Sequence, residues 1–279
     1  MLYEDIMEAV ATIHLWDARK PSLAVILGSG LGDLANAVEN VVSIPYADIP
    51  HFASSTVKGH AGRLLIGELQ GVPLVVMQGR FHMYEGYAAQ TVTFPVRVMR
   101  MLGAQTLVVS NAAGGINPIY RPGDFMLIKD HINLPGIAGA NPLIGPNDER
   151  LGERFIPGVG CYDTELRVLT QRVADTLPEV TLHEGIYTMV TGPNFETPAE
   201  LRFLRTIGSD AVGMSTVPEV LVARHMEMRV LGISLITNSA TGEEGLEVSH
   251  SEVLATADAA RTKFASLVQG IVGVLKTVV

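Results

Sequence analysis

Only one cysteine, Cys161, occurs among the 279 residues, and the apolar residues never gather into one long uninterrupted run. A lone cysteine cannot form an internal disulfide, which excludes a small secreted domain held together by disulfides. A membrane-spanning helix needs about 20 consecutive apolar residues, and no segment has them. The N-terminal stretch carries acidic side chains early and lacks the basic start of a secretory signal. Together these absences predict a cytoplasmic protein with no membrane partner.

Positive charge is also scarce, because 20 lysines and arginines face 29 aspartates and glutamates and leave a formal net charge of −9. Such a chain has no general attraction for nucleic acid or for an anionic membrane. If it binds an anion, a local cluster of cationic and hydroxyl groups must hold that anion.

Several well-known motifs are missing as well. The sequence has no G-x-x-x-x-G-K-[ST] phosphate loop, no G-x-S-x-G nucleophile elbow, and no H-E-x-x-H or Cys–His spacing for a metal. The glycine-rich stretch at residues 28–32 does not complete the dinucleotide pattern G-x-G-x-x-G, since Asp33 stands at its third glycine position. By itself this stretch predicts a tight turn, and no metal site is expected.

The pattern of apolar residues, which make up 47% of the chain, predicts the fold class. Helical periodicity predicts helices over 4–19, 88–102, 164–176, 198–208, 217–228 and 250–277. Short apolar runs predict strands over 23–27, 73–77, 106–110, 186–190, 210–214 and 229–237. This alternation favours an α/β fold with a mixed, mostly parallel twisted sheet flanked by helices. Residues 132–160 predict a long ordered loop, and without any linker we expect a single domain over 1–279.

Small and polar residues follow nearly every predicted strand. The stretches that follow them, in order, are GSGLG (28–32), QGRFH (78–82), NAAGG (111–115), TGPNFE (191–196), GMS (213–215) and NS (238–239). In open α/β sheets, ligands bind outside the carboxyl ends of the strands. The sequence therefore predicts a polar ligand crevice along one sheet edge.

The stretch MQGRFHMYEG at residues 77–86 places three unusual side chains close together. In an extended chain, Arg80, His82 and Tyr84 would share one face. A surface ion pair with Glu85 is one interpretation. The other is a phosphate site, because the planar fork of an arginine can grip phosphate at two points. The apolar flanks favour the phosphate site.

Most of the remaining candidate site residues lie at predicted helix starts. Ser215 stands before Thr216 and Glu219, which predict a capping box and therefore free N–H groups that attract anions. A similar box, Thr197 with Glu200, follows Glu196, whose carboxylate would either balance the helix dipole or accept donors from a ligand. Two candidates remain: Asn238 follows a predicted strand, and His250 lies in the capping box Ser249–Glu252.

Ten strings in order carry a resemblance to a known family: ILGSGLGDL, STVKGHAGRL, MQGRFHMYEG, FPVRVMRMLG, VSNAAGGINP, KDHINLPG, GPNDERLGERF, GPNFETPAE, VGMSTVPEV and SLITN. From about Ser22 to Val253 the chain resembles the trimeric purine nucleoside phosphorylases. The resemblance implies phosphate binding by Ser29, His60, Arg80, His82, Ala112 and Ser215. It implies nucleoside binding by Tyr84, Phe155, Phe195, Glu196, Met214, Asn238 and His250, with Phe155 reaching the site of a neighbouring subunit in a homotrimer.

The activity implied is reversible phosphorolysis of 6-oxopurine ribonucleosides and deoxyribonucleosides, in purine salvage. Asn238, Glu196 and His82 would carry the catalysis, and inorganic phosphate would be a co-substrate with no cofactor. Some family members have Lys after the asparagine, where this chain has Ser239, so xanthosine stays open beside inosine and guanosine. The alternatives are a methylthioadenosine phosphorylase, a nucleoside hydrolase and a non-catalytic sensor. An acidic residue at position 238 would favour the first of these, and an acidic metal cluster the second.

Overall fold

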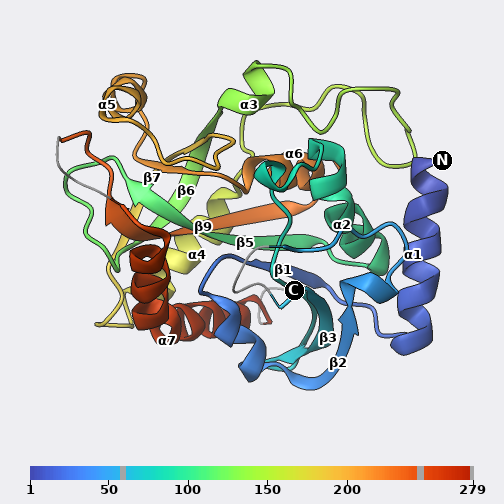
Figure 1. The fold of residues 1–279 in the computed structure, drawn as a ribbon. Helices are drawn as coiled ribbons and strands as arrows, with labels where there is room; N and C mark the ends of the chain where they lie inside the picture. Colours follow the sequence, from blue (N-terminus) through green and yellow to red (C-terminus); the bar gives the residue numbers. More distant parts are fainter. Residues whose placement is uncertain (57–60, 244–247, 277–279) are drawn as a thin grey trace.

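The computed structural model describes residues 1–56, 61–243 and 248–276. Within them, nine strands form one sheet in the order β2-β3-β4-β1-β5-β8-β7-β6-β9 (Figure 1). Their bounds are β1 Leu23–Leu27, β2 Glu39–Pro45, β3 Arg63–Leu69, β4 Val72–Gln78, β5 Thr106–Gly115, β6 Phe125–Asn133, β7 Leu182–Met189, β8 Ala211–Gly213 and β9 Arg229–Ser239. Strand β5 also pairs with β9, so the strands from β5 to β9 close on themselves.

The sheet is mixed, as the sequence predicts. Parallel pairs join β1 to β4 and β5, β5 to β9, and β7 to β6 and β8. Antiparallel pairs join β3 to β2 and β4, β5 to β8, and β6 to β9. Both faces of the central strands are buried, which is typical of a sheet covered by helices on both sides.

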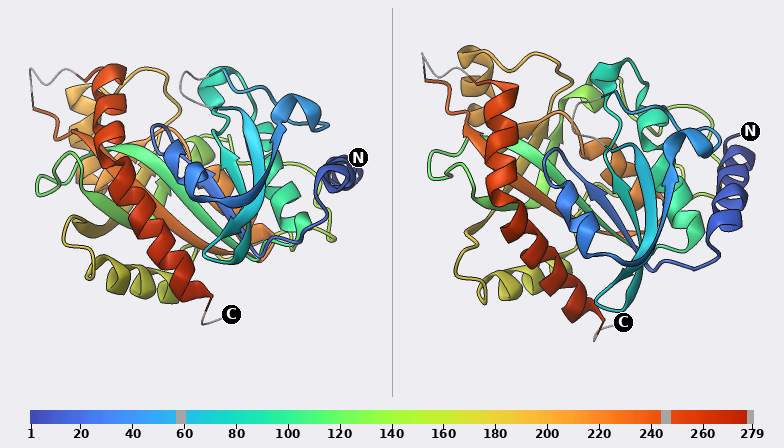
Figure 2. Two further views of the ribbon diagram at one scale, coloured as in Figure 1. Left: turned by 90° about the horizontal axis from the view of Figure 1, so that it is seen from below. Right: turned by 60° about the horizontal axis from the view of Figure 1, so that its bottom comes forward.

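Helices cover both faces of the sheet. Their bounds are α1 Leu2–Trp16, α2 Ala89–Leu102, α3 Leu134–Ile137, α4 Thr164–Ala174, α5 Pro198–Thr206, α6 Val217–His225 and α7 His250–Leu275. Ala24 and Ile26 of β1 pack in the core that contains α1, α2 and α6, whereas Leu23 and Val25 pack in the core under α4 and α7. This alternation is the period-two pattern of a strand buried on both faces. Figure 2 shows α7 crossing its face of the sheet, with α1 at the other side of the molecule.

Three strands, β2, β3 and β6, are absent from the sequence prediction, for physical reasons. Strand β2 lies at the sheet edge and exposes most of its residues, so it lacks a hydrophobic signal. Strand β3 carries Gly67, which packs against Val38 and Glu39 and weakens the strand pattern. Strand β6 ends in polar residues.

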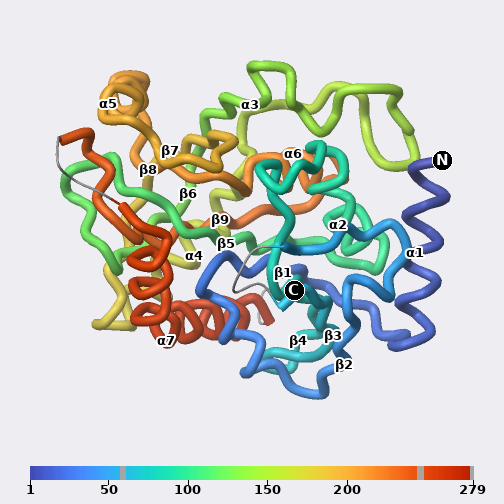
Figure 3. The backbone as a smooth tube through the Cα atoms, in the orientation of Figure 1, coloured from blue at the N-terminus to red at the C-terminus, as the bar shows by residue number. Residues whose placement is uncertain are grey.

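The long loop predicted at 132–160 starts later, because β6 and the short α3 occupy its first residues. Beyond them, residues 138–163 contain no regular element. The loop extends to the start of α1 (Figure 3), where Arg150 forms an ion pair with Glu4 at 3.0 Å and lies over the Tyr3 ring. No described helix is long and apolar enough to cross a membrane.

Candidate active site

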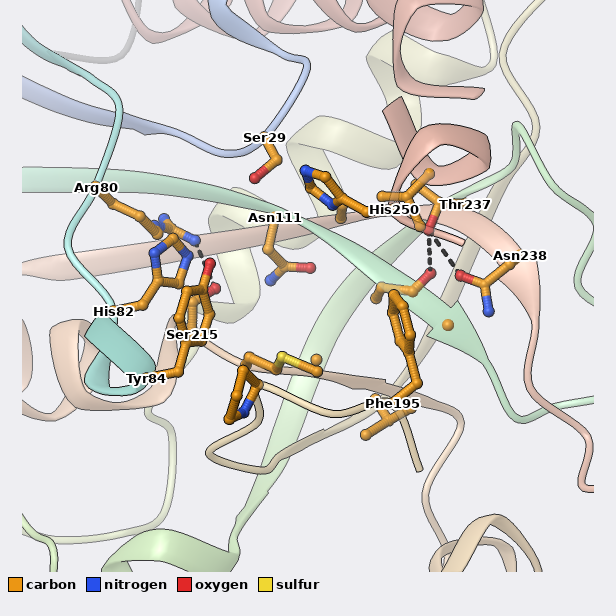
Figure 4. A pocket seen from close by; sticks show the side chains of 18 of the residues that line it. Ser29, Arg80, His82, Tyr84, Asn111, Phe195, Ser215, Thr237, Asn238 and His250 are labelled. Carbon is orange, nitrogen blue, oxygen red and sulfur yellow. Dashed lines mark hydrogen bonds between the residues drawn. The ribbon is translucent and has the colours of Figure 1, made fainter. Parts of the chain in front are cut away.

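A cavity of about 480 Å³ lies where the predicted strand ends meet. Its lining includes side chains from the turn after β1, the segment after β4, β5, the β7–α5 loop, the β8–α6 junction, the end of β9 and the start of α7 (Figure 4). The predicted residues in its wall are Ser29, Arg80, His82, Tyr84, Ala112, Phe195, Glu196, Met214, Ser215, Asn238 and His250. The sheet thus brings together residues that are far apart in the sequence, as expected for a ligand crevice.

One end of the cavity is built around the buried guanidinium of Arg80, which is 2% exposed. Its Nη1 donates to Ser215 Oγ at 2.8 Å and to Thr216 Oγ1 at 3.2 Å. Its Nε lies 3.2 Å from the carboxylate of the equally buried Glu219. The surface ion pair with Glu85 is therefore wrong for Arg80, because Glu219 compensates its charge from inside the core.

The capping box predicted for Thr216 and Glu219 is also wrong. The Thr216 side chain makes no capping bond to helix α6. Instead its hydroxyl accepts from Arg80 and from Asn111 Nδ2 at 2.9 Å. Both members of the expected box contact the Arg80 guanidinium instead of capping the helix start. The boxes at Thr197 and Ser249 do form.

His82 and Tyr84 continue this end of the cavity. The predicted extended alternation stops at His82, because Met83–Glu85 form a 3-10 turn. The two rings stack at 4.5 Å between centroids, and His82 Nδ1 lies 3.3 Å from Glu85 Oε1. Burial raises the pKa of Tyr84 to about 12, so its hydroxyl stays protonated and can donate. The contact between His82 and Glu85, considered as an alternative from the sequence, is present, but both side chains are buried instead of lying at the surface.

Glu85 has a fixed position because several donors hold it. Burial alone would raise its pKa, but the backbone N–H and hydroxyl of Thr56, at 2.8 and 2.6 Å, and the backbone N–H of His82 hold the pKa below its usual range. The carboxylate therefore stays ionised beside the His82 ring and orients it.

The turn after β1 brings Ser29 to the same end. A Cβ at Gly28 would lie 2.8 Å from the Asn111 Cα, and Gly30 has a φ of 74° next to Ala257. Only glycine allows this close approach and this backbone conformation. The glycines are thus explained by packing of the turn against β5 and α7, and they leave Ser29 in the cavity wall.

The other end of the cavity carries an amide, a carboxylate and a ring. Thr237 Oγ1 lies 2.9 Å from Asn238 Oδ1, and Asn238 Nδ2 donates to Ser239 O at 3.3 Å. Burial raises the pKa of the Glu196 carboxyl. Phe195 is 42% exposed and offers a ring face beside them (Figure 4). This end can bind a flat ligand that has both donors and acceptors at its edge.

Comparison with known proteins identifies the family. The family model described as "Phosphorylase superfamily" matches residues 22–273. Purine nucleoside phosphorylase 1 of Bacillus subtilis is 54% identical over 267 residues, which cover 96% of this chain and 97% of the relative. The purine nucleoside phosphorylase of Bos taurus is 52% identical over 269 residues, 95% of this chain and 93% of the relative. The chain belongs to the purine nucleoside phosphorylase family.

A solved family structure has the same fold. The purine nucleoside phosphorylase of Schistosoma mansoni in complex with inosine superposes with a TM-score of 0.93 at 43% identity, over 97% of this chain and 96% of that chain. Another Schistosoma structure contains guanosine, with a TM-score of 0.92 at 42% identity over 97% and 96% of the two chains. The resemblance stated from the ten sequence strings is therefore confirmed at the level of the family and the fold.

Two residues expected from the family do not lie in the cavity of this subunit. His60 is outside the described residues. Phe155 is 84% exposed on the long loop and does not line the cavity of its own chain. A role for Phe155 in a neighbouring subunit stays a prediction. Among the described residues, no group of three or more His, Cys, Asp or Glu could hold a metal ion.

Sequence reasoning missed several residues that build the site. The missed residues are Thr56, Asn111, Thr216, Glu219 and Thr237. Asn111 directly follows the strand predicted at 106–110 and Thr237 ends the strand predicted at 229–237, so the strand-end argument could have singled them out. The other three gain their roles from contacts across the fold, for which no local pattern exists.

Proposed function

We propose that the protein catalyses the reversible phosphorolysis of 6-oxopurine nucleosides, including inosine and guanosine, to the free base and ribose 1-phosphate or its deoxy form. The observation that carries this proposal is that the two ends of one cavity differ in chemistry. Arg80, Ser215, His82 and Ser29 gather donors at one end, while Asn238 and Glu196 stand at the other. The high identity to purine nucleoside phosphorylases over nearly the whole chain supports the same reaction.

At the phosphate end, Arg80 supplies the compensating charge, and the hydroxyls of Ser29 and Ser215 donate to the phosphate oxygens. His82, oriented by Glu85, donates from the other side, and the backbone N–H of Ala112 completes the set. Hydrogen bonds between such donors and an anion are stronger than neutral ones. His60 belongs to this set by family resemblance.

At the base end, Phe195 packs against the purine, and the Glu196 carboxylate accepts from N1–H. The Asn238 amide accepts from N7–H and donates to O6. Between the two ends, Tyr84, Met214 and His250 surround the sugar, with His250 at the 5′-hydroxyl.

The reaction follows from this placement. As the C1′–N9 bond breaks, its electron pair leaves with the purine, and the sugar becomes cationic. Asn238 and Glu196 stabilise the charge that develops on the base, which acts as an oxyanion hole does. A phosphate oxygen then bonds to C1′. Hydrogen phosphate loses one proton overall, and the departing base gains one, so the reaction balances with no cofactor and no covalent enzyme intermediate.

The proposal limits the purine base to 6-oxopurines and does not include methylthioadenosine. Asn238 stands where an acidic residue would favour a 6-amino group, and the compared relatives bear the name purine nucleoside phosphorylase, so methylthioadenosine phosphorylase is not favoured. Ser239 supplies no positive charge near O6.

We propose a homotrimer in which the exposed Phe155 completes a neighbour's sugar pocket, and a cytoplasmic role in purine salvage.

The test is cleavage of inosine with and without inorganic phosphate, with hypoxanthine and ribose 1-phosphate both measured. The proposal requires strict dependence on phosphate and equal amounts of the two products. Release of hypoxanthine with free ribose in the absence of phosphate would make the protein a hydrolase. Binding of inosine without cleavage would make it a sensor.

A further inference from the structure

The residue that links Ser215 to helix α6 has a strained backbone. Thr216 has φ 79° and ψ −53°, and Val217 N donates to Ser215 O at 2.9 Å across it. This is the γ-turn with positive φ, which is rare and strained. Glycine adopts such angles most easily, and a β-branched residue there is an outlier. Strain of this kind persists only where surrounding contacts hold it. The Thr216 side chain therefore needs a compensating role.

The contacts of the Thr216 hydroxyl define that role. The residue is fully buried, and its Oγ1 accepts from Arg80 Nη1 at 3.2 Å and from Asn111 Nδ2 at 2.9 Å. A hydroxyl has two acceptor sites and one hydrogen. The two N–H donors fill both acceptor sites. The hydrogen of Thr216 is left for its third partner, Ser215 Oγ, at 3.2 Å.

The same count then settles the direction of the Ser215 hydroxyl. Ser215 Oγ accepts from Arg80 Nη1 at 2.8 Å and from the Thr216 hydroxyl, so both of its acceptor sites are filled. Its own hydrogen is therefore left to donate, either to the Tyr187 hydroxyl, which also contacts Ser215, or to a ligand, because Ser215 lines the cavity. The hydroxyl can thus donate to a ligand but cannot accept from one.

We propose that Thr216 is a positioning residue that fixes Ser215 as a pure donor to the bound phosphate. The donors run in one direction, from Asn111 through Thr216 and Ser215 to the phosphate oxygen. Chains of this kind polarise one another and strengthen the last bond. The arrangement suits a ligand oxygen that accepts a hydrogen bond, such as an anionic oxygen of phosphate. This inference rests on the proposed phosphorolysis.

The experiment compares Thr216→Val, which keeps the shape and removes the hydroxyl, with Thr216→Ser, which keeps the hydroxyl. A hydrogen bond to an anion is worth about 1.5–3 kcal/mol, which corresponds to roughly 10-fold or more in affinity. We expect Thr216→Val to raise the phosphate KM about 10-fold and to leave the inosine KM within about twofold. Thr216→Ser should restore the phosphate KM. Thr170→Val, which removes a buried hydroxyl bonded within α4, is the control that should change neither constant.

A double-mutant cycle separates positioning from simple structural damage. If Thr216 acts through the Ser215 hydroxyl, Thr216→Val should change phosphate affinity less than about twofold in a Ser215→Ala background. An equal effect in both backgrounds, or a Thr216→Ser variant as weak as Thr216→Val, would overturn the inference. Thr216→Ala removes the hydroxyl with less backbone strain and serves if the valine variant does not fold.

Calorimetry of inorganic phosphate binding to the nucleoside-free protein distinguishes a failure of the proposed function from a failure of the inference about Thr216. If the wild type binds phosphate but does not cleave inosine, the proposed function fails, while the variant series still tests the donor chain. If the wild type is an active phosphorylase and the Thr216 variants bind phosphate equally, only the inference about Thr216 fails.

Discussion

The buried ion pair between Arg80 and Glu219 leads to a prediction about both the free energy of unfolding and the binding of phosphate. The side chains of Arg80 and Glu219 are 2% and 3% exposed. Removing one partner of a buried pair costs about 3–5 kcal/mol, because the other charge is left uncompensated. For Glu219→Gln we expect the lower value, about 3 kcal/mol, since glutamine keeps an oxygen that can face Arg80 Nε. At about 2–3 °C per kcal/mol for a chain of this size, the Tm should fall by about 6–9 °C.

Phosphate should reverse part of this loss. In the variant, Arg80 is a buried cation without its carboxylate, and a phosphate bound in the proposed site would supply the missing negative charge. Phosphate also loses the repulsion of a nearby carboxylate. A ligand that binds only the folded state stabilises it by RT ln(1 + [L]/Kd), so tighter binding gives a larger rise in Tm. Glu219→Gln should therefore gain more in Tm from phosphate than the wild type does.

The assay is thermal unfolding of both proteins across a phosphate titration at constant ionic strength. Glu179→Gln removes the same charge from an exposed position and should shift the free energy of unfolding by less than about 0.5 kcal/mol. A phosphate-induced rise in Tm that is equal in the variant and the wild type would refute the reasoning, because it would mean that Glu219 does not compensate the charge that phosphate meets.

Three further predictions concern the base end and the subunit contact. Asn238→Ala should lower kcat by roughly 10²–10³, because in the proposed mechanism it removes a group that stabilises the leaving base; steady-state kinetics with inosine measures this. Burial raises the pKa of Glu196, and in the proposed site its ionised form is the stronger acceptor for N1–H, so kcat/KM for inosine should fall with decreasing pH at a higher pH than an ordinary glutamate would cause. A pH profile of Glu196→Gln should lack that acidic limb. Phe155→Ala should raise the inosine KM, provided that sedimentation shows a trimer.

Each of these has an outcome that contradicts it. A change in KM alone for Asn238→Ala would mean that the amide binds substrate and transition state equally. An acidic limb that persists in Glu196→Gln would assign the titration to another group. For Phe155, the control is Leu15→Ala, which truncates a side chain of similar exposure on α1. An active monomer would remove Phe155 from the site.

Local rules predicted those elements whose signals are local. The central strands β1, β4 and β5 are apolar runs buried on both faces, and the boxes at Thr197 and Ser249 satisfy their own helix ends. The edge strand β2 escaped prediction because its residues face solvent and carry little hydrophobic pattern. Whether a strand forms at an edge depends on its neighbour in the sheet, which sequence periodicity does not contain.

The site likewise combines features that the sequence predicts with contacts that only the fold creates. Amino-acid sequence alone determined an α/β chain with anion-binding residue types after its strands, and its motifs were sufficient to indicate the family. Tertiary structure decided which partners these residues take. Thr216 and Glu219 match a capping box in sequence, but both side chains contact the guanidinium of Arg80, which is 136 residues from Thr216. A buried guanidinium is far more costly to leave uncompensated than a helix N–H near water, so the distant contact overrides the local one.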